Sequence, residues 1–342
     1  MTHRGRTDYV LFAAVIVLIA FGLLMVYSSS SVVAEVTYKE QSYYFLVRQL
    51  ISAVLAVGAL MLLSRRDYRK FHSSQWAFAL LGIVLFLLVL VFFVDRRHRW
   101  IPLGVTTLQP SELAKPALIL FLAWFVRQRQ GFINDRRTIL SAGMALAVLA
   151  LTVVIADLGT AAVLVATAGA VFFVAGLRFR IFALAMAVGS VCLAGSIYFW
   201  PYRWIRVVNW FSPDTAGDGG YQVRQSLIAI GSGGVTGKGL MESWQKLLYL
   251  PEAHTDFIYA IIGEELGLVG CLAVLGAFLL ILYRGYSAWW TAADDFGRYI
   301  AVGVTTSLVF QALMNMTVVL DLMPTKGITL PLISYGGSSL LA

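Results

Sequence analysis

The chain opens on an uninterrupted apolar run, VLFAAVIVLIAFGLLMV at residues 10–26. A helix of about 20 such residues crosses the roughly 30 Å hydrocarbon core of a membrane. The first predicted span covers 10–33, and similar runs lie at 45–63, 76–94, 113–126, 139–155, 158–175, 181–199, 257–283 and 299–320. No small-residue cleavage pattern follows the first run, so we expect a retained span and not a signal peptide.

A tenth apolar run starts near Leu330 and stops at Ala342, too short to cross a membrane as it stands. We expect the natural chain to continue beyond this point. The sequence therefore predicts an all-α membrane protein, a polytopic bundle of about ten transmembrane helices with a truncated tenth. It predicts a single integral membrane domain over residues 1–342.

Composition supports a membrane protein over a soluble one. Of the 342 residues, 59% are hydrophobic and 13% are charged, and the mean hydropathy is +0.80. Soluble domains carry about 25% charged residues. Cys192 and Cys271 lie within apolar runs, where a free thiol acts as a small hydrophobe, so we predict no disulfide. The net charge of +8 comes from basic residues at the ends of runs, which favours anionic lipid headgroups and predicts no nucleic-acid partner.

The orientation follows from lysine and arginine residues in short loops, because these concentrate on the cytoplasmic side. With the N-terminus inside, fourteen fall on that side: Arg4, Arg6, Arg65, Arg66, Arg69, Lys70, Arg127, Arg129, Arg136, Arg137, Arg178, Arg180, Arg284 and Arg298. Five fall in the short outer loops: Lys39, Arg96, Arg97, Arg99 and Lys326. The reverse orientation would invert this bias, so we predict a cytoplasmic N-terminus.

This orientation places residues 200–256 outside, as a long extracytoplasmic loop between spans seven and eight. Loops of this length in compact proteins are usually functional or disordered. Here aromatic and basic side chains alternate: Trp204, Trp210, Phe211, Tyr221, Trp244 and Tyr249 with Arg203, Arg206, Arg224, Lys238 and Lys246. We therefore expect the loop to pack on the top of the bundle or at the membrane interface, and to carry part of a functional site.

Within this loop, the glycine-rich stretch GSGGVTGKG (231–239) invites a nucleotide-binding interpretation. A phosphate-binding P-loop needs glycine at 232 and Ser or Thr at 239, where this chain has Ser232 and Gly239. Two interpretations stay open. The stretch is either a flexible turn after an amphipathic segment at 221–230, or a place where the backbone approaches a phosphate-bearing ligand.

The segment LLYLPEAHTD (247–256) runs directly into span eight and ends at Asp256. Aspartate at a helix start usually caps it, because the carboxylate accepts hydrogen bonds from helix N–H groups. A catalytic carboxylate is the alternative. His254 and Asp256 have no third ligand at convincing spacing, so the pattern does not support a metal site built from protein side chains alone.

Charged residues in or at the edges of spans suggest a polar cavity, because burying them in lipid is unfavourable. Arg48 lies four residues into span two, and Glu112 and Lys115 lie on one face of span four, where they can pair. Together they favour a cavity for an anionic lipid headgroup at the outer leaflet, although Arg48 and Lys115 could instead extend to the headgroups. Asp157 opens span six at the same level, where capping explains it equally well. Glu264 and Glu265 of span eight are expected to face the bundle interior and pair there.

The outer loop RRHRWIPLG (96–104) violates the positive-inside pattern. It could anchor the chain at the interface through Trp100 or attract phosphate, and the sequence does not separate these two roles.

Several motifs along the chain together resemble those of the SEDS family (shape, elongation, division and sporulation). They are RWIPLG (99–104), QPSELAK (109–115), DLGT (157–160), YQ (221–222), QSLIAIGSGG (225–234), GKG (237–239), LPEAHTDF (250–257) and SYGGS (334–338). The resemblance runs over nearly the whole chain. PTKG (324–327) and PEAH (251–254) resemble the division branch, FtsW, more than the elongation branch, RodA.

The resemblance implies a peptidoglycan glycosyltransferase that polymerises lipid II on the outer face of the cytoplasmic (inner) membrane, at the division septum. Asp256 matches the essential acid of the family, and we expect it to be the general base on the acceptor hydroxyl, with undecaprenyl pyrophosphate as leaving group. Residues expected to bind substrate are Arg48, Gln109, Glu112, Lys115, Lys246, His254, Thr255 and Ser334. Arg48, Lys115, Lys246 and a divalent cation, Mg or Mn, are the candidates for stabilising the leaving group. No organic cofactor is expected.

The implied partners are lipid II, the undecaprenyl-linked glycan strand, membrane lipids, other divisome proteins and a class B penicillin-binding protein. That transpeptidase is expected to dock on spans eight and nine, where Phe310, Leu313, Met314 and Val318 form an apolar stripe. Two other functions stay open: a lipid II flippase, and a scaffold that recruits and activates the transpeptidase. A flippase needs charges that reach the cytoplasmic leaflet, whereas the candidates here gather at the outer one.

Overall fold

The computed structural model describes residues 8–95, 99–102, 107–211 and 218–342. Its elements are α1 (Tyr9–Val36), α2 (Tyr44–Ser64), the 3-10 helix η1 (Tyr68–His72), α3 (Ser74–Val94), β1 (Ile101–Pro102), β2 (Thr107–Leu108), α4 (Pro110–Gln128), α5 (Arg136–Ala156), α6 (Leu158–Val174), α7 (Phe179–Tyr198), α8 (Pro201–Phe211), α9 (Asp218–Gly233), α10 (Ile258–Thr291), α11 (Asp295–Val319) and α12 (Gly337–Leu341). The two strands form one short antiparallel pair, so the prediction of an all-α fold is confirmed.

Within the described ranges, seven helices are long and apolar enough to cross a membrane: α1, α2, α3, α5, α7, α10 and α11. α6 is apolar but has only 17 residues, and α4 carries Glu112, Lys115 and Arg127. Each of the nine complete runs expected from the sequence falls on one helix and extends beyond it by at most one residue, although several helices, α10 above all, are longer than the run.

The helix expected to begin near Leu330 begins later, at Gly337. Between these two residues the chain turns, and side chains satisfy its backbone. The Leu330 amide donates to Ser334 Oγ at 2.8 Å, and Gln49 Nε2 donates to the Ser334 carbonyl at 3.1 Å. Pro331 lacks the amide that a helix would need there.

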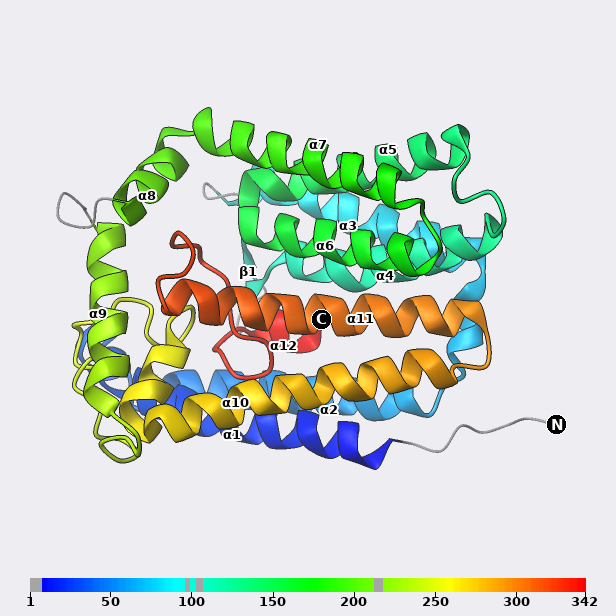
Figure 1. Cartoon of the computed structure of the whole chain (residues 1–342). Helices are drawn as coiled ribbons and strands as arrows, with labels where there is room; N and C mark the ends of the chain where they lie inside the picture. The colour runs from blue at the N-terminus through cyan, green and yellow to red at the C-terminus, as the bar shows by residue number, and fades with distance from the viewer. Residues whose placement is uncertain (1–7, 96–98, 103–106, 212–217) are drawn as a thin grey trace.

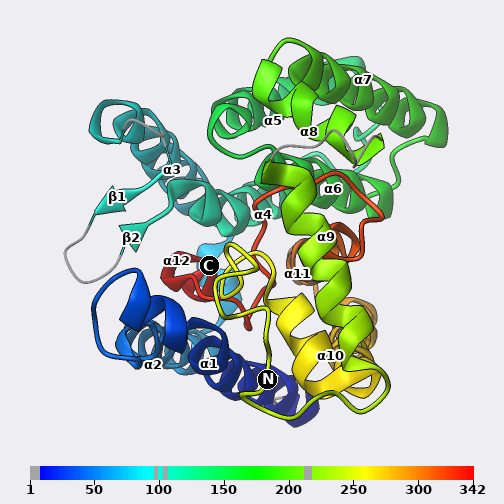
Figure 2. The same ribbon diagram turned by 90° about the vertical axis from the view of Figure 1, so that its left-hand side faces the viewer.

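The long helices lie side by side in a bundle, with α12 inside it between α2 and α4 (Figures 1 and 2). One apolar core joins α1, α10 and α11 around Met25, Ile258 and Phe278. A second joins α3, α4, α5 and α6 around Leu122 and Leu164. α11 packs against α10 on one side and against α4 and α6 on the other, so it connects the two cores.

The described parts of the long loop are ordered helices and turns and not a disordered linker. α8 and α9 lie across one end of the bundle, at the left of Figure 1. Ser226 of α9 donates to the Val319 carbonyl of α11 at 2.9 Å. Trp210 of α8 donates from its indole to the Asp321 carbonyl at 3.0 Å. The expectation that this loop packs on the bundle is confirmed.

The glycine-rich stretch ends α9 and then turns, so the turn expected after the amphipathic segment is confirmed, and this turn is packed against α10. α10 is kinked at Gly267, which has φ +65°. At the kink the amide of Leu268 donates to the Gly234 carbonyl at 2.9 Å, and that of Lys238 donates to the Glu264 carbonyl at 3.0 Å. A Cβ on Gly237 would lie 2.1 Å from the Glu265 carbonyl oxygen. The close approach is therefore to another part of the chain, which leaves the Lys238 amide unavailable to a phosphate.

Candidate functional site

A cavity of about 840 Å³ opens at the end of the bundle that α8 and α9 cross. Its walls come from the starts of α2, α4 and α6, the ends of α5 and α7, part of α8, the turn before α10, and residues 323–329 after α11. Because neighbouring helices alternate in direction, these ends meet at one face of the bundle. Four of the residues expected from the sequence line the cavity: Arg48, Gln109, Thr255 and Asp256.

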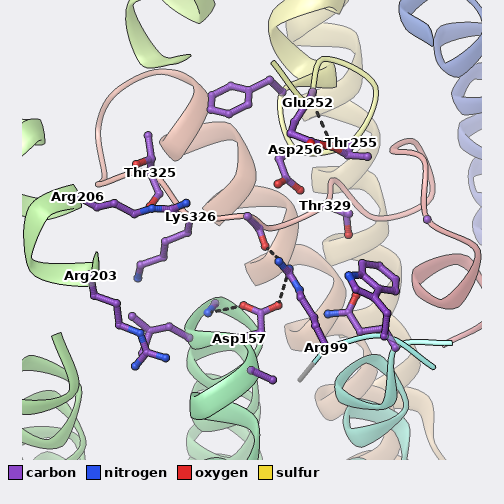
Figure 3. Close-up of a pocket in the computed structure, with 18 of the residues that line it drawn as sticks. Arg99, Asp157, Arg203, Arg206, Glu252, Thr255, Asp256, Thr325, Lys326 and Thr329 are labelled. Atoms are coloured by element: carbon purple, nitrogen blue, oxygen red, sulfur yellow. Dashed lines mark hydrogen bonds and ion pairs between the residues drawn. The ribbon is translucent and has the colours of Figure 1, made fainter. Parts of the chain in front are cut away.

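Asp256 projects its carboxylate into this cavity from the turn before α10 (Figure 3). Asn315 of α11 holds that turn, donating from Nδ2 to the carbonyls of Asp256 and Ile328, both at 2.7 Å. The N-cap of α10 is Phe257, and no side chain caps it. The capping interpretation of Asp256 is therefore wrong, because its carboxylate faces the cavity and not the helix amides.

The surroundings of Asp256 raise its pKa to about 7, chiefly because burial disfavours the charged carboxylate. The Arg99 guanidinium opposes this and lowers the pKa, while the carboxylates of Glu252 and Asp157 raise it further. A carboxylate with a pKa near the ambient pH is suited to accepting and returning a proton. Perturbed acids of this kind gather at functional sites.

Arg99 and Asp157 form an ion pair across the cavity wall. Arg99 Nη2 lies 3.3 Å from Asp157 Oδ2 and donates to the Gly327 carbonyl at 3.0 Å. Asp157 also caps α6, accepting from the Gly159 amide at 2.9 Å, so the capping proposed for it from sequence is confirmed. A Cβ on Gly327 would lie 2.9 Å from Asp256 Oδ2. Only glycine therefore leaves room for the carboxylate beside this pair.

The loop that violates the positive-inside pattern reaches the site through Arg99 and Trp100, which both line the cavity. Arg96, Arg97 and Gly104 of the same loop lie outside the described residues, as do Arg4 and Arg6. Of the two roles left open for this loop, the position of Arg99 favours the attraction of an anion.

Arg48, Gln109 and Thr255 line the cavity at fixed positions. The Arg48 guanidinium stacks 4.3 Å from the centre of the Tyr44 ring. Gln109 Nε2 donates to Ser111 Oγ at 3.0 Å. Thr255 Oγ1 donates to a carboxylate oxygen of Glu252 at 2.8 Å.

Five other expected substrate-binding residues are absent from the lining of this cavity: Glu112, Lys115, Lys246, His254 and Ser334. Lys115 Nζ lies 2.6 Å from Glu112 Oε2 and 2.6 Å from Gln311 Oε1, so the pair joins α4 to α11. The pairing expected of these two residues is confirmed, and their contact with substrate stays a prediction.

His254 is buried against the rings of Phe45 and Tyr335, at centroid distances of 4.7 and 5.7 Å. Burial lowers the pKa of this imidazole, so at neutral pH it is uncharged. Ser334 accepts from the Leu330 amide, as described above. Both residues brace the turn that carries Asp256, because the Tyr335 amide donates to the His254 carbonyl at 2.9 Å.

A second group of charges, the paired cluster of Lys238, Lys246, Glu264 and Glu265, lies beside the cavity within the loop and α10. Lys246 Nζ lies 3.0 Å from Glu265 Oε1, which also accepts from Ser28 Oγ at 2.6 Å. Lys238 Nζ lies 2.7 Å from Glu264 Oε1. The expectation that the two glutamates face inward and pair is confirmed.

Besides Arg99, three cations of the cavity are absent from the site residues expected from the sequence: Arg203 and Arg206 of α8, and Lys326 after α11. The two arginines are three residues apart and so share one helix face. This spacing is the sequence feature that could have indicated a shared anion site for the two arginines. From the sequence, the two arginines stand out only as basic residues of the loop, and Lys326 only as a contribution to the charge of the outer loops.

The divalent cation stays a prediction. Within the described ranges, no group of three or more His, Cys, Asp or Glu side chains could hold a metal ion. Asp157 already binds Arg99 and the α6 amides, and Glu252 binds Thr255, which leaves Asp256 as a possible ligand. Such a set fits only an ion that takes most of its remaining ligands from substrate phosphates and water, as Mg²⁺ commonly does.

The expected docking stripe on α11 is wrong in part. Met314 and Val318 are buried within the bundle, at 4% and 2% exposure. Met314 packs against Val163 of α6 and Ile328. Within the stripe only Leu313 is exposed, because α11 is the central helix that joins the two cores.

Comparison with known proteins places the chain in one family. The family model of FtsW, RodA and SpoVE, described as "Cell cycle protein", matches residues 8–342. The chain is 41% identical to "Probable peptidoglycan glycosyltransferase FtsW" of Trichlorobacter lovleyi, over 98% of this chain and 89% of that protein. It is 38% identical to "Stage V sporulation protein E" of Bacillus subtilis, over 99% of this chain and 94% of that protein.

Two solved structures have the same fold. The chain matches the Thermus thermophilus rod shape determining protein RodA with a TM-score of 0.72 and 28% identity, over 99% of this chain and 94% of that one. It matches a chain of the structure titled "Structural coordination of polymerization and crosslinking by a peptidoglycan synthase complex" with a TM-score of 0.78 and 27% identity, over 98% and 94%. This chain therefore belongs to the family of FtsW, RodA and SpoVE, the SEDS family.

Proposed function

We propose that this protein is a peptidoglycan glycosyltransferase of the FtsW type, which polymerises lipid II into glycan strands during cell division. The observation that carries the proposal is Asp256, a carboxylate that faces a cavity rich in cations and whose pKa is raised to about 7. Curated relatives named as peptidoglycan glycosyltransferases align over nearly the whole chain, which supports the same activity here.

In the reaction, the 4-hydroxyl of the acceptor N-acetylglucosamine approaches Asp256, which accepts its proton. The hydroxyl oxygen forms a bond to C1 of the donor sugar as the bond from C1 to the phosphate oxygen breaks. The electron pair leaves with undecaprenyl pyrophosphate. A single displacement inverts the anomeric carbon, so one base suffices and no second carboxylate is needed close to Asp256.

The leaving pyrophosphate gains negative charge, which fixed cations stabilise most strongly in a cavity that excludes much of the solvent. Arg48, Arg99, Arg203, Arg206 and Lys326 all line the cavity. A divalent cation held between Asp256 and substrate phosphates would supply further charge stabilisation. We assign this role to the cations of the cavity and not to Lys115 and Lys246, because each of these lysines is paired with a carboxylate outside the cavity lining.

We place the cavity at the outer face of the inner membrane, with ten spans and the N-terminus in the cytoplasm. The excess of lysine and arginine in the opposite loops supports this orientation. Residues 200–256 then form the extracytoplasmic loop that builds one wall of the site, and the septum is where an FtsW-type enzyme would act. The substrate would enter from the outer leaflet with its isoprenoid chain in the membrane.

We also propose a crosslinking partner, a class B penicillin-binding protein, together with other divisome proteins. The solved structure that resembles this chain comes from a complex whose title couples polymerization with crosslinking. Exposed apolar residues such as Leu272 and Leu279 of α10 and Val304 of α11 offer a membrane face to a single helix. The scaffold role is compatible with catalysis, since a partner could activate the enzyme.

The direct test uses purified protein and lipid II in detergent, where there is no membrane to cross. A glycosyltransferase yields glycan strands, with or without the transpeptidase, that a muramidase degrades. A flippase or a pure scaffold yields none under either condition. Absence of strands in the presence of the partner, from protein that is folded and monodisperse, would contradict the proposal.

A further inference from the structure

The cations of the cavity fall into two groups on opposite sides of Asp157 and Asp256. Figure 3 shows Arg203, Arg206 and Lys326 on one side, with the Lys326 side chain between the two arginines, and Arg99 on the other. We call the first group the α8 cations. Arg48 of α2 and Gln109 of α4 line the cavity together with Arg99.

The α8 cations differ from the other charged groups in their lack of acidic partners among the described residues. Within the described part of the chain, no carboxylate lies within ion-pair distance of Arg203, Arg206 or Lys326. Arg203 donates from Nη2 to the Val154 carbonyl at the end of α5 and stacks on Trp200, but its Nη1 is buried without a hydrogen-bond partner. A buried N–H group without an acceptor is unfavourable, so this geometry favours an acceptor that arrives with a ligand.

The electrostatics of this group also favour an anion. Burial lowers the pKa of the Lys326 amine and of the Arg203 guanidinium, while the charge of Asp157 opposes both shifts. Asp157 is itself paired with Arg99. Three cations with so little compensation bind a multiply charged anion better than a singly charged one, because each contact is charge-assisted.

The opposite side of the cavity is closer to neutral. Arg99 is held by Asp157 and by the Gly327 carbonyl. Arg48 stacks on Tyr44 and has no acidic partner among the described residues, so this side holds one uncompensated cation, against three among the α8 cations. Such groups can position a headgroup whose charge does not change during the reaction, but they offer less stabilisation to charge that develops.

Apolar side chains adjoin the α8 cations. Leu193 and Ile197 of α7 and Ile155 of α5 line the same cavity. α7 ends at Tyr198, only a few residues before Trp200 and Arg203. A ligand with a pyrophosphate group and an isoprenoid chain matches this arrangement of cations beside an apolar wall.

We propose that Arg203, Arg206 and Lys326 form the donor subsite, which holds the pyrophosphate that leaves, and that the side of Arg48 and Arg99 holds the acceptor headgroup. This assignment rests on the proposed glycosyltransferase function. Its physical basis is that the larger uncompensated positive charge stands where negative charge develops, at the oxygen released from the donor C1.

A binding experiment tests the subsite without requiring catalysis. The probe is farnesyl pyrophosphate, titrated into the purified full chain in detergent. With no divalent cation added, we expect Asp256→Asn to bind it at least as tightly as the unchanged protein, because the Asp256 carboxylate then only repels the pyrophosphate. We expect Arg203→Gln and Lys326→Met each to weaken binding about tenfold or more, the loss expected for a charge-assisted contact. Arg48→Gln should change the affinity less than about threefold, and Arg180→Gln, an exposed arginine at the start of α7, should not change it.

A kinetic experiment separates donor from acceptor. A lipid II analogue with an inverted 4-hydroxyl on its N-acetylglucosamine can act only as donor, and it is coupled to ordinary lipid II as acceptor. Arg203→Gln and Lys326→Met should raise KM for the donor analogue and lower kcat, with KM for the acceptor unchanged. Arg48→Gln should raise KM for the acceptor.

The reverse pattern, in which Arg48→Gln abolishes pyrophosphate binding and raises the donor KM, would overturn the assignment. Equal binding by all variants would overturn it as well. If farnesyl pyrophosphate binding follows the predicted pattern but no glycan forms from any substrate, the anion subsite stands and the proposed polymerase function fails. The two failures are therefore distinguishable.

Discussion

The paired cluster and the cavity contain the same kinds of charged side chain, but these side chains form ion pairs in the cluster and are largely unpaired in the cavity. In the paired cluster, Glu264 Oε2 accepts from Ser243 Oγ at 2.5 Å and from the Gln245 amide at 3.2 Å, in addition to the ion pair of Oε1 with Lys238. In the cavity, Asp256 faces open space, and the α8 cations have no acidic partner among the described residues. A buried charge that is paired cannot lose its partner without destabilising the fold, whereas charges left unpaired at a cavity remain available to a ligand.

The largest expected effect is on catalysis, at Asp256. Asp256→Asn keeps the shape of the side chain and removes the base, so the rate of lipid II polymerisation should fall about 10²–10⁴-fold. The thermal unfolding midpoint should not fall, because the carboxylate caps no helix and burial disfavours its charged form. Polymerisation at near the original rate would show that another group accepts the proton.

The matching effect on stability is expected in the paired cluster. Lys246→Met leaves Glu265 charged, buried and without its cation, which should cost about 3–5 kcal/mol of unfolding free energy. Lys326→Met is the control, since it removes a lysine for which the described residues provide no carboxylate partner, and it should change stability by less than about 0.5 kcal/mol. Thermal unfolding of both variants in detergent checks this. Similar losses from both would erase the distinction between the two regions.

Substitution of one glycine beside each region extends the comparison between the paired cluster and the cavity. Gly237 has φ +83°, and a Cβ there would meet the Glu265 carbonyl, so Gly237→Ala should destabilise the fold by about 1–3 kcal/mol. At Gly327 a Cβ would meet the Asp256 carboxylate. Gly327→Ala should therefore lower activity about tenfold and leave the unfolding midpoint nearly unchanged, because a side chain can rotate away where backbone cannot. Loss of stability without loss of activity at Gly327 would contradict the account.

The spans were predictable from the sequence because a membrane helix needs a long apolar run, and each of the nine complete runs is a helix. The start of the last helix was not, because Pro331 and the contacts of Gln49 and Ser334 act across the bundle. Asp256, Arg48 and Gln109 could be identified as site residues from motifs and from their positions at helix ends.

The sequence did not show which lysines and arginines form ion pairs and which line the cavity. Lys246 and Lys326 both belong to segments that the charge distribution predicts to lie outside the membrane, and only their surroundings differ. Lys246 meets Glu265 because the glycine-rich stretch lies against α10, a long-range contact that local spacing does not encode. Arg203 and Arg206 reach the cavity because α8 lies across the bundle end, whereas an amphipathic helix of this composition is also typical of a membrane surface.

The dependence of the elongation rate on pH, measured under single-turnover conditions, tests the central claim most directly: Asp256 accepts the proton and its neighbours set its pKa. The rate should fall on the acid side with a midpoint at about pH 7, because the protonated carboxylate cannot act as a base. Arg99→Gln removes a charge that lowers this pKa, so the midpoint should move to higher pH and the deficit should shrink as the pH rises. A rate that stays flat between about pH 5.5 and 8.5, or a midpoint that Arg99→Gln moves to lower pH, would contradict the assignment of Asp256 as the base.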